Sequence, residues 1–333
     1  MLRSETALPP VRSFSKSQIT VFALKIFVTL ACFWYLFRHI DVAELRRTLP
    51  GFNVPWAGLG VVLLMAQIPL IALRWLEIVN VLKMRGERLT YPWMTAAAAI
   101  GQFFGQILPV VAGDGIRVWF LARFGGDWRD AAVSVVIDRC IGVGLLLVFA
   151  FAILLLPSHL DLFGGYRGEV VVTLGAMILI GVVGLVLGAR ISPAFAERRH
   201  AKWIASFFTG AYRAVFGPHC VAILGVGALI HVLTIAAVWS LGRAQGLVLS
   251  PTDAGTLFAV MVGVALVPFS VGGWGLRELA MVSLFGNYGL TPERALLFSM
   301  YFGLACVIAS LPGAVTWFAV AIPRPAQSLR SGG

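Results

Sequence analysis

Residues 131–156 read AAVSVVIDRCIGVGLLLVFAFAILLL, a run of 26 residues with one acidic and one basic side chain. A helix needs about 20 apolar residues to cross the hydrocarbon core of a bilayer. This segment is therefore predicted to span a membrane. Its Asp138 and Arg139 cost at least about 2.5–3.5 kcal/mol each at the centre of a bilayer, so we expect these side chains to have partners or a function.

The composition of the whole chain agrees with that segment. The 333 residues are 59% apolar and 12% charged, whereas soluble domains carry about a quarter charged residues. This composition excludes a soluble enzyme, a nucleic-acid-binding domain and a disordered chain. The net charge of +11 is typical of a membrane protein whose cytoplasmic loops are rich in Lys and Arg.

Apolar runs recur along the chain and predict a polytopic, all-α membrane protein. The second run is followed directly by Arg74, which marks its predicted end. From the N-terminus onward the runs are 19–37, 55–73, 93–112, 131–156, 169–189, 220–242, 254–271, 276–287 and 295–322.

Two of these runs are interrupted by Gly and Pro, in the strings ILPVVAGDGIR (107–117) and LVPFSVGGWGLR (266–277). If every run crossed the membrane from a cytoplasmic N-terminus, 10 Lys and Arg would lie inside and 14 outside, against the positive-inside rule. If 93–126 and 254–287 are re-entrant hairpins, the counts become 17 inside and 7 outside. The sequence therefore predicts about six full spans and two re-entrant hairpins.

The order of these elements repeats, which predicts a 3+3 inverted repeat. Inverted repeats with broken helices at matching positions point to a transport site, although Gly/Pro-rich stretches can also resemble each other by chance. Residues 200–217 alternate apolar and polar side chains at helical spacing and predict an interfacial amphipathic helix. The predicted divisions are a cytoplasmic tail (1–18), a first repeat (19–160) with hairpin 93–126, a second repeat (161–322) with helix 200–217 and hairpin 254–287, and a cytoplasmic tail (323–333).

The hairpin tips are expected to reverse at residues that favour turns, because glycine permits sharp bends and leaves backbone N–H groups uncovered. A helix that starts after such a turn carries partial positive charge at its N-terminal end, which suits an anion. The residues assigned to the tips are Pro109, Gly113, Gly115, Pro268, Gly272, Gly273 and Gly275.

Charged residues near these tips form the candidate substrate site. Arginine beside a helix start could hold a phosphate, and a lipid phosphate is the natural anion inside a membrane protein. Two alternatives stay open. One is purely structural, in which Asp138 pairs with Arg117 and the second hairpin's acid with an opposing arginine. The other is direct proton coupling through Asp114 or Asp138. The candidate residues are Asp114, Arg117, Asp138, Arg139, Arg277 and Glu278.

No chemistry beyond this is predicted. The four Cys and five His are scattered singly without the spacing of a metal site, so we expect no metal, no cofactor and no catalytic residue.

Three strings carry a resemblance to a known family: LPVVAGDGIR (108–117), AVSVVIDRCIG (132–142) and VPFSVGGWGLRE (267–278). In this order and spacing they resemble the membrane domain of bacterial lysylphosphatidylglycerol synthases and related free-standing flippase-like membrane proteins. The resemblance implies a domain that moves a lipid between leaflets. In free-standing members it implies a role in glycolipid, polyprenyl-phosphate or hopanoid pathways.

Two departures limit what the resemblance implies. The soluble aminoacyl-transferase domain of the synthases is absent from this sequence, so synthase activity is not expected. The family usually has two glycines before the aspartate, where this sequence has Ala112 and Gly113 before Asp114. Trp274 stands where a small residue is common in the family. A bulky ring at the second tip could change which headgroup fits.

The predicted function is therefore a lipid flippase or transporter for a phosphate-containing lipid in the bacterial inner membrane, and not an enzyme. Its predicted partners are membrane lipids, with a lipid or glycan biosynthetic enzyme as a further candidate and no nucleic acid. Two alternatives stay open, a membrane-embedded lipid-modifying enzyme and a non-transporting scaffold for such an enzyme. The headgroup, direction, energy coupling and oligomeric state do not follow from the sequence.

Overall fold

Every regular element in the described part of the structure, a computed structural model, is a helix. The described residues are 51–84, 89–108, 110–123, 127–157, 164–195, 202–265, 274–285 and 291–321, with six helical residues between Phe27 and Arg38. The helices are α3 (Val54–Met65), α4 (Gln67–Val81), α5 (Tyr91–Ile107), α6 (Val110–Arg123), α7 (Trp128–Leu155), α8 (Arg167–Ile191), α9 (Lys202–Phe216), α10 (Cys220–Ala244), α11 (Pro251–Ala265), α12 (Leu276–Phe285) and α13 (Pro292–Ala321), with short 3-10 turns at Gly164–Tyr166 and Ser192–Phe195.

Five helical stretches are long and apolar enough to cross a membrane, so the chain is a multi-pass helical membrane protein. Each overlaps one of the predicted spans. The predicted first span, 19–37, lies mostly outside the described residues. The five stretches are Val54–Val81, Trp128–Leu155, Arg167–Ala194, Cys220–Ala244 and Pro292–Ala319.

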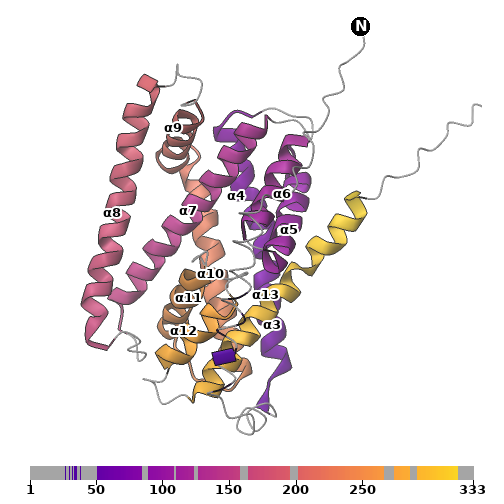
Figure 1. The fold of residues 1–333 in the computed structure, drawn as a ribbon, viewed down its shortest axis with the longest axis vertical. Coiled ribbons are helices and arrows are strands. Elements are labelled where there is room, and N and C mark those ends of the chain that lie inside the picture. Colours follow the sequence, from indigo (N-terminus) through magenta and orange to yellow (C-terminus); the bar gives the residue numbers. More distant parts are fainter. Residues whose placement is uncertain are drawn as a thin grey trace, which may run out of the picture.

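Two pairs of shorter helices occupy opposite halves of the molecule. The pair α5–α6 lies in the upper half of Figure 1 and α11–α12 in the lower half. Helices α5 and α6 have 17 and 14 residues, and α11 and α12 have 15 and 10, all shorter than the roughly 20 residues of a full span. The pair α5–α6 shares an apolar cluster with α4 and α7, whereas α11–α12 shares another with α3, α10 and α13.

The sequence predicted that the second span ends at Arg74, and the structure shows that it does not. The helix continues to Val81, and it is interrupted instead at Ala66 between α3 and α4. Pro69 explains this break, because proline lacks an N–H and its ring clashes with the carbonyl four residues earlier. Arg74 therefore lies in the middle of α4, where its side chain is buried.

Gly113 and Gly115 were predicted at the first hairpin tip, but both lie inside α6. Helix α5 ends at Ile107 and α6 begins at Val110. Pro109 lies outside the described residues, as do Pro268, Gly272 and Gly273. A Cβ atom at Gly113 would collide with the backbone of α5 at the Gly101 carbonyl, so this glycine allows close helix packing. Gly275 does precede a helix, with a φ of 86° that favours glycine.

Helix α9 occupies the segment in which a helix was predicted at 200–217, and its buried residues are all small. Small residues fill the tight contacts with neighbouring helices: Ala205, Gly210, Ala211 and Ala214 are buried. Trp203 remains 56% exposed. The position of α9 at a membrane interface stays a prediction.

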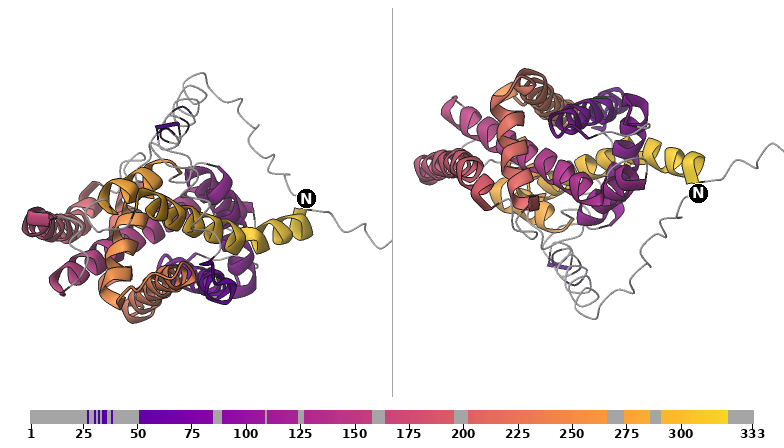
Figure 2. Two further views of the ribbon diagram at one scale, coloured as in Figure 1. Left: turned by 90° about the horizontal axis from the view of Figure 1, so that it is seen from below. Right: turned by 90° about the horizontal axis from the view of Figure 1, so that it is seen from above.

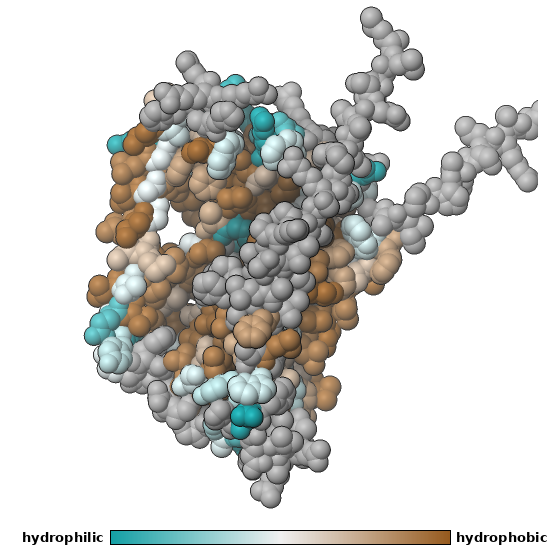
Figure 3. Space-filling model, viewed as in Figure 1, coloured by the Kyte–Doolittle hydropathy of each residue, from teal (hydrophilic) through white to brown (hydrophobic). Residues whose placement is uncertain are grey.

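Helix α8 lies at the edge of the bundle in both views of Figure 2. No residue of α8 is buried, and its contacts run along α7 and α9. The face drawn in Figure 3 is largely apolar, with hydrophilic residues at both ends and a hydrophilic patch part-way between them.

Candidate functional site

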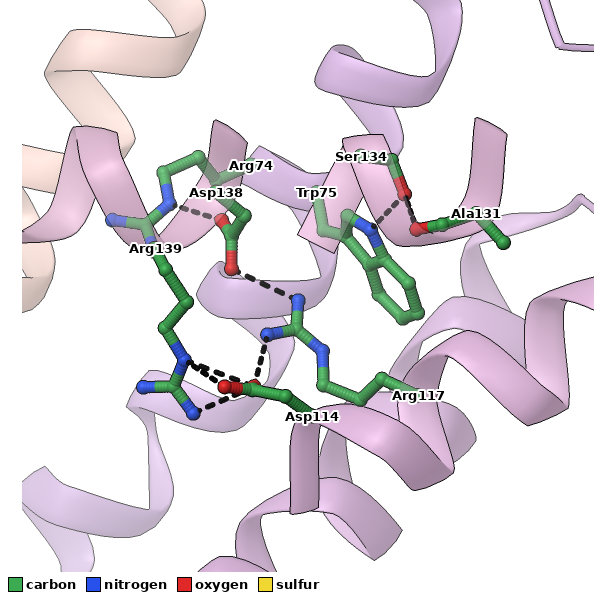
Figure 4. A network of polar contacts seen from close by, with 8 residues as sticks. All are labelled: Arg74, Trp75, Asp114, Arg117, Ala131, Ser134, Asp138 and Arg139. Carbon is green, nitrogen blue, oxygen red and sulfur yellow. Dashed lines mark hydrogen bonds and ion pairs between the residues drawn. The ribbon is translucent and has the colours of Figure 1, made fainter. Parts of the chain in front are cut away.

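Asp138 on α7 is the centre of a buried network of charges (Figure 4). Arg74 of α4 donates from Nε to Oδ1 at 2.8 Å, and Arg117 of α6 donates from Nη2 to Oδ2 at 2.9 Å. All three side chains are buried. Because a buried ion can be tolerated only when it is paired and hydrogen-bonded, these contacts fix α4 and α6 against α7.

Arg117 is held by its surroundings as well as by Asp138. Its guanidinium carbon lies 4.2 Å from the centre of the Trp75 ring, a cation–π contact. The Trp75 indole N–H donates to the Ser134 hydroxyl at 3.1 Å, and that hydroxyl donates to the Ala131 carbonyl at 2.8 Å. A Cβ atom at Gly101 would lie 2.5 Å from Cγ of Arg117, so glycine at this point of α5 leaves room for the arginine.

Asp114 and Arg139 form the accessible edge of the same network. Arg139 donates from Nε to both carboxylate oxygens of Asp114 at 2.9 Å, and its Nη2 lies 2.8 Å from Oδ1. Arg117 links the two halves, because its Nη1 lies 3.7 Å from Oδ1 of Asp114. The side chains of Arg139 and Asp114 are 44% and 20% exposed, unlike the buried Asp138.

Arg139 lies close to the middle of a candidate span. It is eleven residues beyond the first residue of α7, about 16 Å along a helix of 28 residues. Three arginines and two aspartates give the network a formal charge of +1. A partly exposed guanidinium at this depth attracts anions, because the apolar surroundings screen its charge weakly.

Arg277 and Glu278 form a second, closed cluster at the start of α12. Oε1 of the fully buried Glu278 accepts from Arg277 Nη2 at 2.5 Å and from the Ser299 hydroxyl at 2.9 Å. Its Oε2 accepts from the backbone N–H of Gly275 at 2.7 Å, which caps the helix start. The Arg277 guanidinium lies 4.9 Å from the Trp274 ring centre. Both carboxylate oxygens are therefore occupied.

The two clusters follow the same plan. In each, the second helix of a short pair carries a buried arginine that bonds to the next long helix: Arg117 bonds to α7, and Arg277 bonds to Ser299 of α13 at 3.0 Å. Each arginine stacks on an aromatic ring, and each lies against a glycine of a neighbouring helix, Gly101 or Gly303. Across the ranges that the structure describes, no ion pair joins one cluster to the other.

The sequence pattern of one family, described as the lysylphosphatidylglycerol synthase TM region, matches residues 22–313. The chain belongs to this family. The match confirms the resemblance that the three strings suggested, and it places the buried arginine clusters within the family's membrane region. No curated protein matches the chain.

In this member of the lysylphosphatidylglycerol synthase TM family, four of the six predicted site residues meet in one network. Arg277 and Glu278 form a cluster of their own. Sequence reasoning missed Arg74, because its apolar run was ended at residue 73, eight residues before the end of α4, and the arginine was taken as a boundary. The signal was present: helix-compatible apolar residues continue to Val81. In the described ranges, no group of three His, Cys, Asp or Glu could hold a metal ion.

Proposed function

We propose that this chain moves a phosphate-bearing lipid between the leaflets of the bacterial inner membrane. The observation that carries the proposal is the partly exposed Arg139 near the middle of α7, in a network whose formal charge is +1. An anionic headgroup that reaches this depth finds a positive charge where the bilayer offers none. Membership of a family named for a lipid synthase supports lipid as the substrate.

The proposal includes a topology with a cytoplasmic N-terminus, six spans and two re-entrant hairpins in an inverted repeat. The lengths of α5, α6, α11 and α12 support hairpins that do not cross the bilayer. Chain connectivity supports their opposite entry, because α5–α6 connects the end of α4 to the start of α7, and α11–α12 connects the end of α10 to the start of α13. Inverted repeats of this kind favour alternating access around a central site.

In this mechanism the accessible pair Asp114–Arg139 contacts the lipid headgroup, and the buried ion pairs hold the surrounding helices in place. The phosphate competes with the Asp114 carboxylate for the Arg139 guanidinium, whose fork can bind two oxygens at once. Asp138 holds Arg117 close to the point where the phosphate replaces Asp114 on Arg139. The buried Nε of Arg117 has no hydrogen-bond partner among the described residues. The acyl chains stay in the bilayer while the headgroup passes.

The proposal contains no chemical step and assigns no catalytic residue. The buried carboxylates of the two clusters, Asp138 and Glu278, are each bound by arginine, and a carboxylate held in this way is a poor general base. The formation of a modified lipid by the purified chain would contradict this part of the proposal.

The decisive experiment measures headgroup translocation in vesicles with the purified chain, using a fluorescent phosphatidylglycerol and a membrane-impermeant quencher. Arg139→Gln should slow translocation about tenfold or more, because a hydrogen bond to a charged group contributes about 1.5–3 kcal/mol. Arg139→Lys keeps the charge and should retain part of the rate. Arg190→Gln, an exposed position at the end of α8, is the matched control. An Arg139→Gln protein that is folded and translocates at the unchanged rate would overturn the assignment.

A further inference from the structure

A second site lies at the end of the bundle where α7 and α9 both begin. A cavity of about 410 Å³ opens there, lined by Trp128 and Asp130 of α7 and by Lys202, Trp203 and Ser206 of α9. Its volume is within the range of about 300–1,000 Å³ that is typical of small-molecule pockets. Asp130 precedes Arg139 by nine residues, about 14 Å along α7, so the cavity is separate from the charge network.

Two carboxylates, of Asp127 and Asp130, and two cations, Arg129 and Lys202, line the cavity. Asp130 and Lys202 do not bind each other. Within the described residues, neither Asp130 nor Lys202 has an ion-pair or hydrogen-bond partner, although both line the same space. The other two charged residues of the lining have contacts of their own: Asp127 accepts from the backbone N–H of Arg129 at 3.1 Å, and the Arg129 guanidinium lies 5.6 Å from the Trp128 ring centre. A ligand with both a positive and a negative group would satisfy Asp130 and Lys202 together.

Two tryptophans beside the cavity offer a second kind of contact to such a ligand. Trp128 and Trp203 are 62% and 56% exposed, an unusual exposure for such large rings. Their position fits the edge of a bilayer, because Trp128 is the first residue of a candidate span and tryptophan is enriched at the membrane–water boundary. An aromatic ring also attracts an ammonium group, which adds to the effect of a nearby carboxylate.

We propose that this cavity binds the headgroup of a zwitterionic phospholipid. The lipid phosphate pairs with Lys202, and the amino group lies between Asp130 and the tryptophan rings, while the acyl chains extend into the bilayer. The site is distinct from the translocation network and does not depend on it, since a lipid can occupy this edge whether or not the chain transports lipids.

Lipid binding to the full chain, purified in detergent, tests this proposal by native mass spectrometry. The probes are phosphatidylethanolamine and phosphatidylglycerol with identical acyl chains. Phosphatidylethanolamine should bind preferentially, and Asp130→Asn should weaken it by about three- to fivefold, as expected for one exposed charge pair, while leaving phosphatidylglycerol unchanged. Lys202→Gln should weaken both lipids.

Controls separate this outcome from general effects on folding or on charge. Glu169→Gln removes an exposed charge at the start of α8 and should change the binding of neither lipid. Trp203→Leu, checked for an unchanged unfolding midpoint, should weaken the binding of phosphatidylethanolamine alone.

Equal binding of the two lipids, insensitive to Asp130→Asn, would overturn the proposal. Competition by soluble glycerophosphoethanolamine at the same concentration would also overturn it, because the ligand would then not require a membrane anchor. Arg139→Gln should leave this binding unchanged, so failure here and failure of transport are distinguishable.

Discussion

Nη2 of Arg117 lies 2.9 Å from Oδ2 of Asp138, and this buried ion pair joins the second helix of a short helical pair to a candidate membrane span. Asp138 binds Arg74 with its other oxygen. One carboxylate thus pairs with two buried guanidinium groups from two further helices. This arrangement makes Asp138 the residue on which the local structure depends most.

Asp138→Asn should destabilise the protein strongly. The amide leaves Arg74 buried without a counter-charge and leaves Arg117 only its longer contact with Asp114, and loss of one partner of a buried ion pair costs about 3–5 kcal/mol. Unfolding of the purified protein in a denaturing detergent measures this free energy. Glu169→Gln, which removes a carboxylate from an exposed position, should leave the unfolding midpoint in place. A stable Asp138→Asn protein would show that the arginines find other acceptors.

Glu278→Gln should destabilise the second cluster, and a second substitution should restore part of the loss. The single change leaves Arg277 buried and unpaired, at a cost of about 3 kcal/mol or more. Adding Arg277→Met removes the orphaned charge, so the double variant should be more stable than Glu278→Gln alone. The same unfolding measurement on both singles and the double forms a mutant cycle. Additive effects would mean that the two side chains do not interact.

Gly113→Ala and Gly115→Ala should differ sharply although they are two residues apart in α6. The methyl group at Gly113 would meet the backbone of α5 and force the helices apart, which costs about 1–3 kcal/mol. At Gly115 nothing lies within 4 Å of the added Cβ, and alanine favours a helix over glycine by up to about 1 kcal/mol. Unfolding midpoints should therefore fall for the first and hold or rise for the second. Equal losses would indicate a turn at both positions.

Cysteine labelling should place the two short helical pairs on opposite sides of the membrane. In a variant without the native cysteines, Lys83→Cys and Asp127→Cys flank α5–α6 and should react from the same side. Val248→Cys and Thr291→Cys flank α11–α12 and should react from the other side. The measurement uses a membrane-impermeant maleimide on intact spheroplasts and on inverted vesicles. Labelling of Lys83→Cys and Asp127→Cys from opposite sides would rule out the first re-entrant hairpin.

Much of the fold could be predicted from the sequence because membrane insertion depends on local composition. A run such as 131–156 is apolar over enough residues to predict a spanning helix without knowledge of its neighbours. The same locality explains the errors. Arg74 interrupts an apolar run and was taken for its end, whereas the helix tolerates the charge because Asp138 neutralises it from another helix.

The membrane class, the helices and the unusual charges at Asp138 and Arg139 follow from the sequence alone. The partners of these charges depend on how the helices pack. Successive residues of a helix point about 100° apart, so Asp138 faces the buried arginines while its neighbour Arg139 reaches Asp114 at the accessible edge. Which charge becomes buried depends on how α4, α6 and α7 cross, and that crossing is set by packing contacts between residues far apart in the chain.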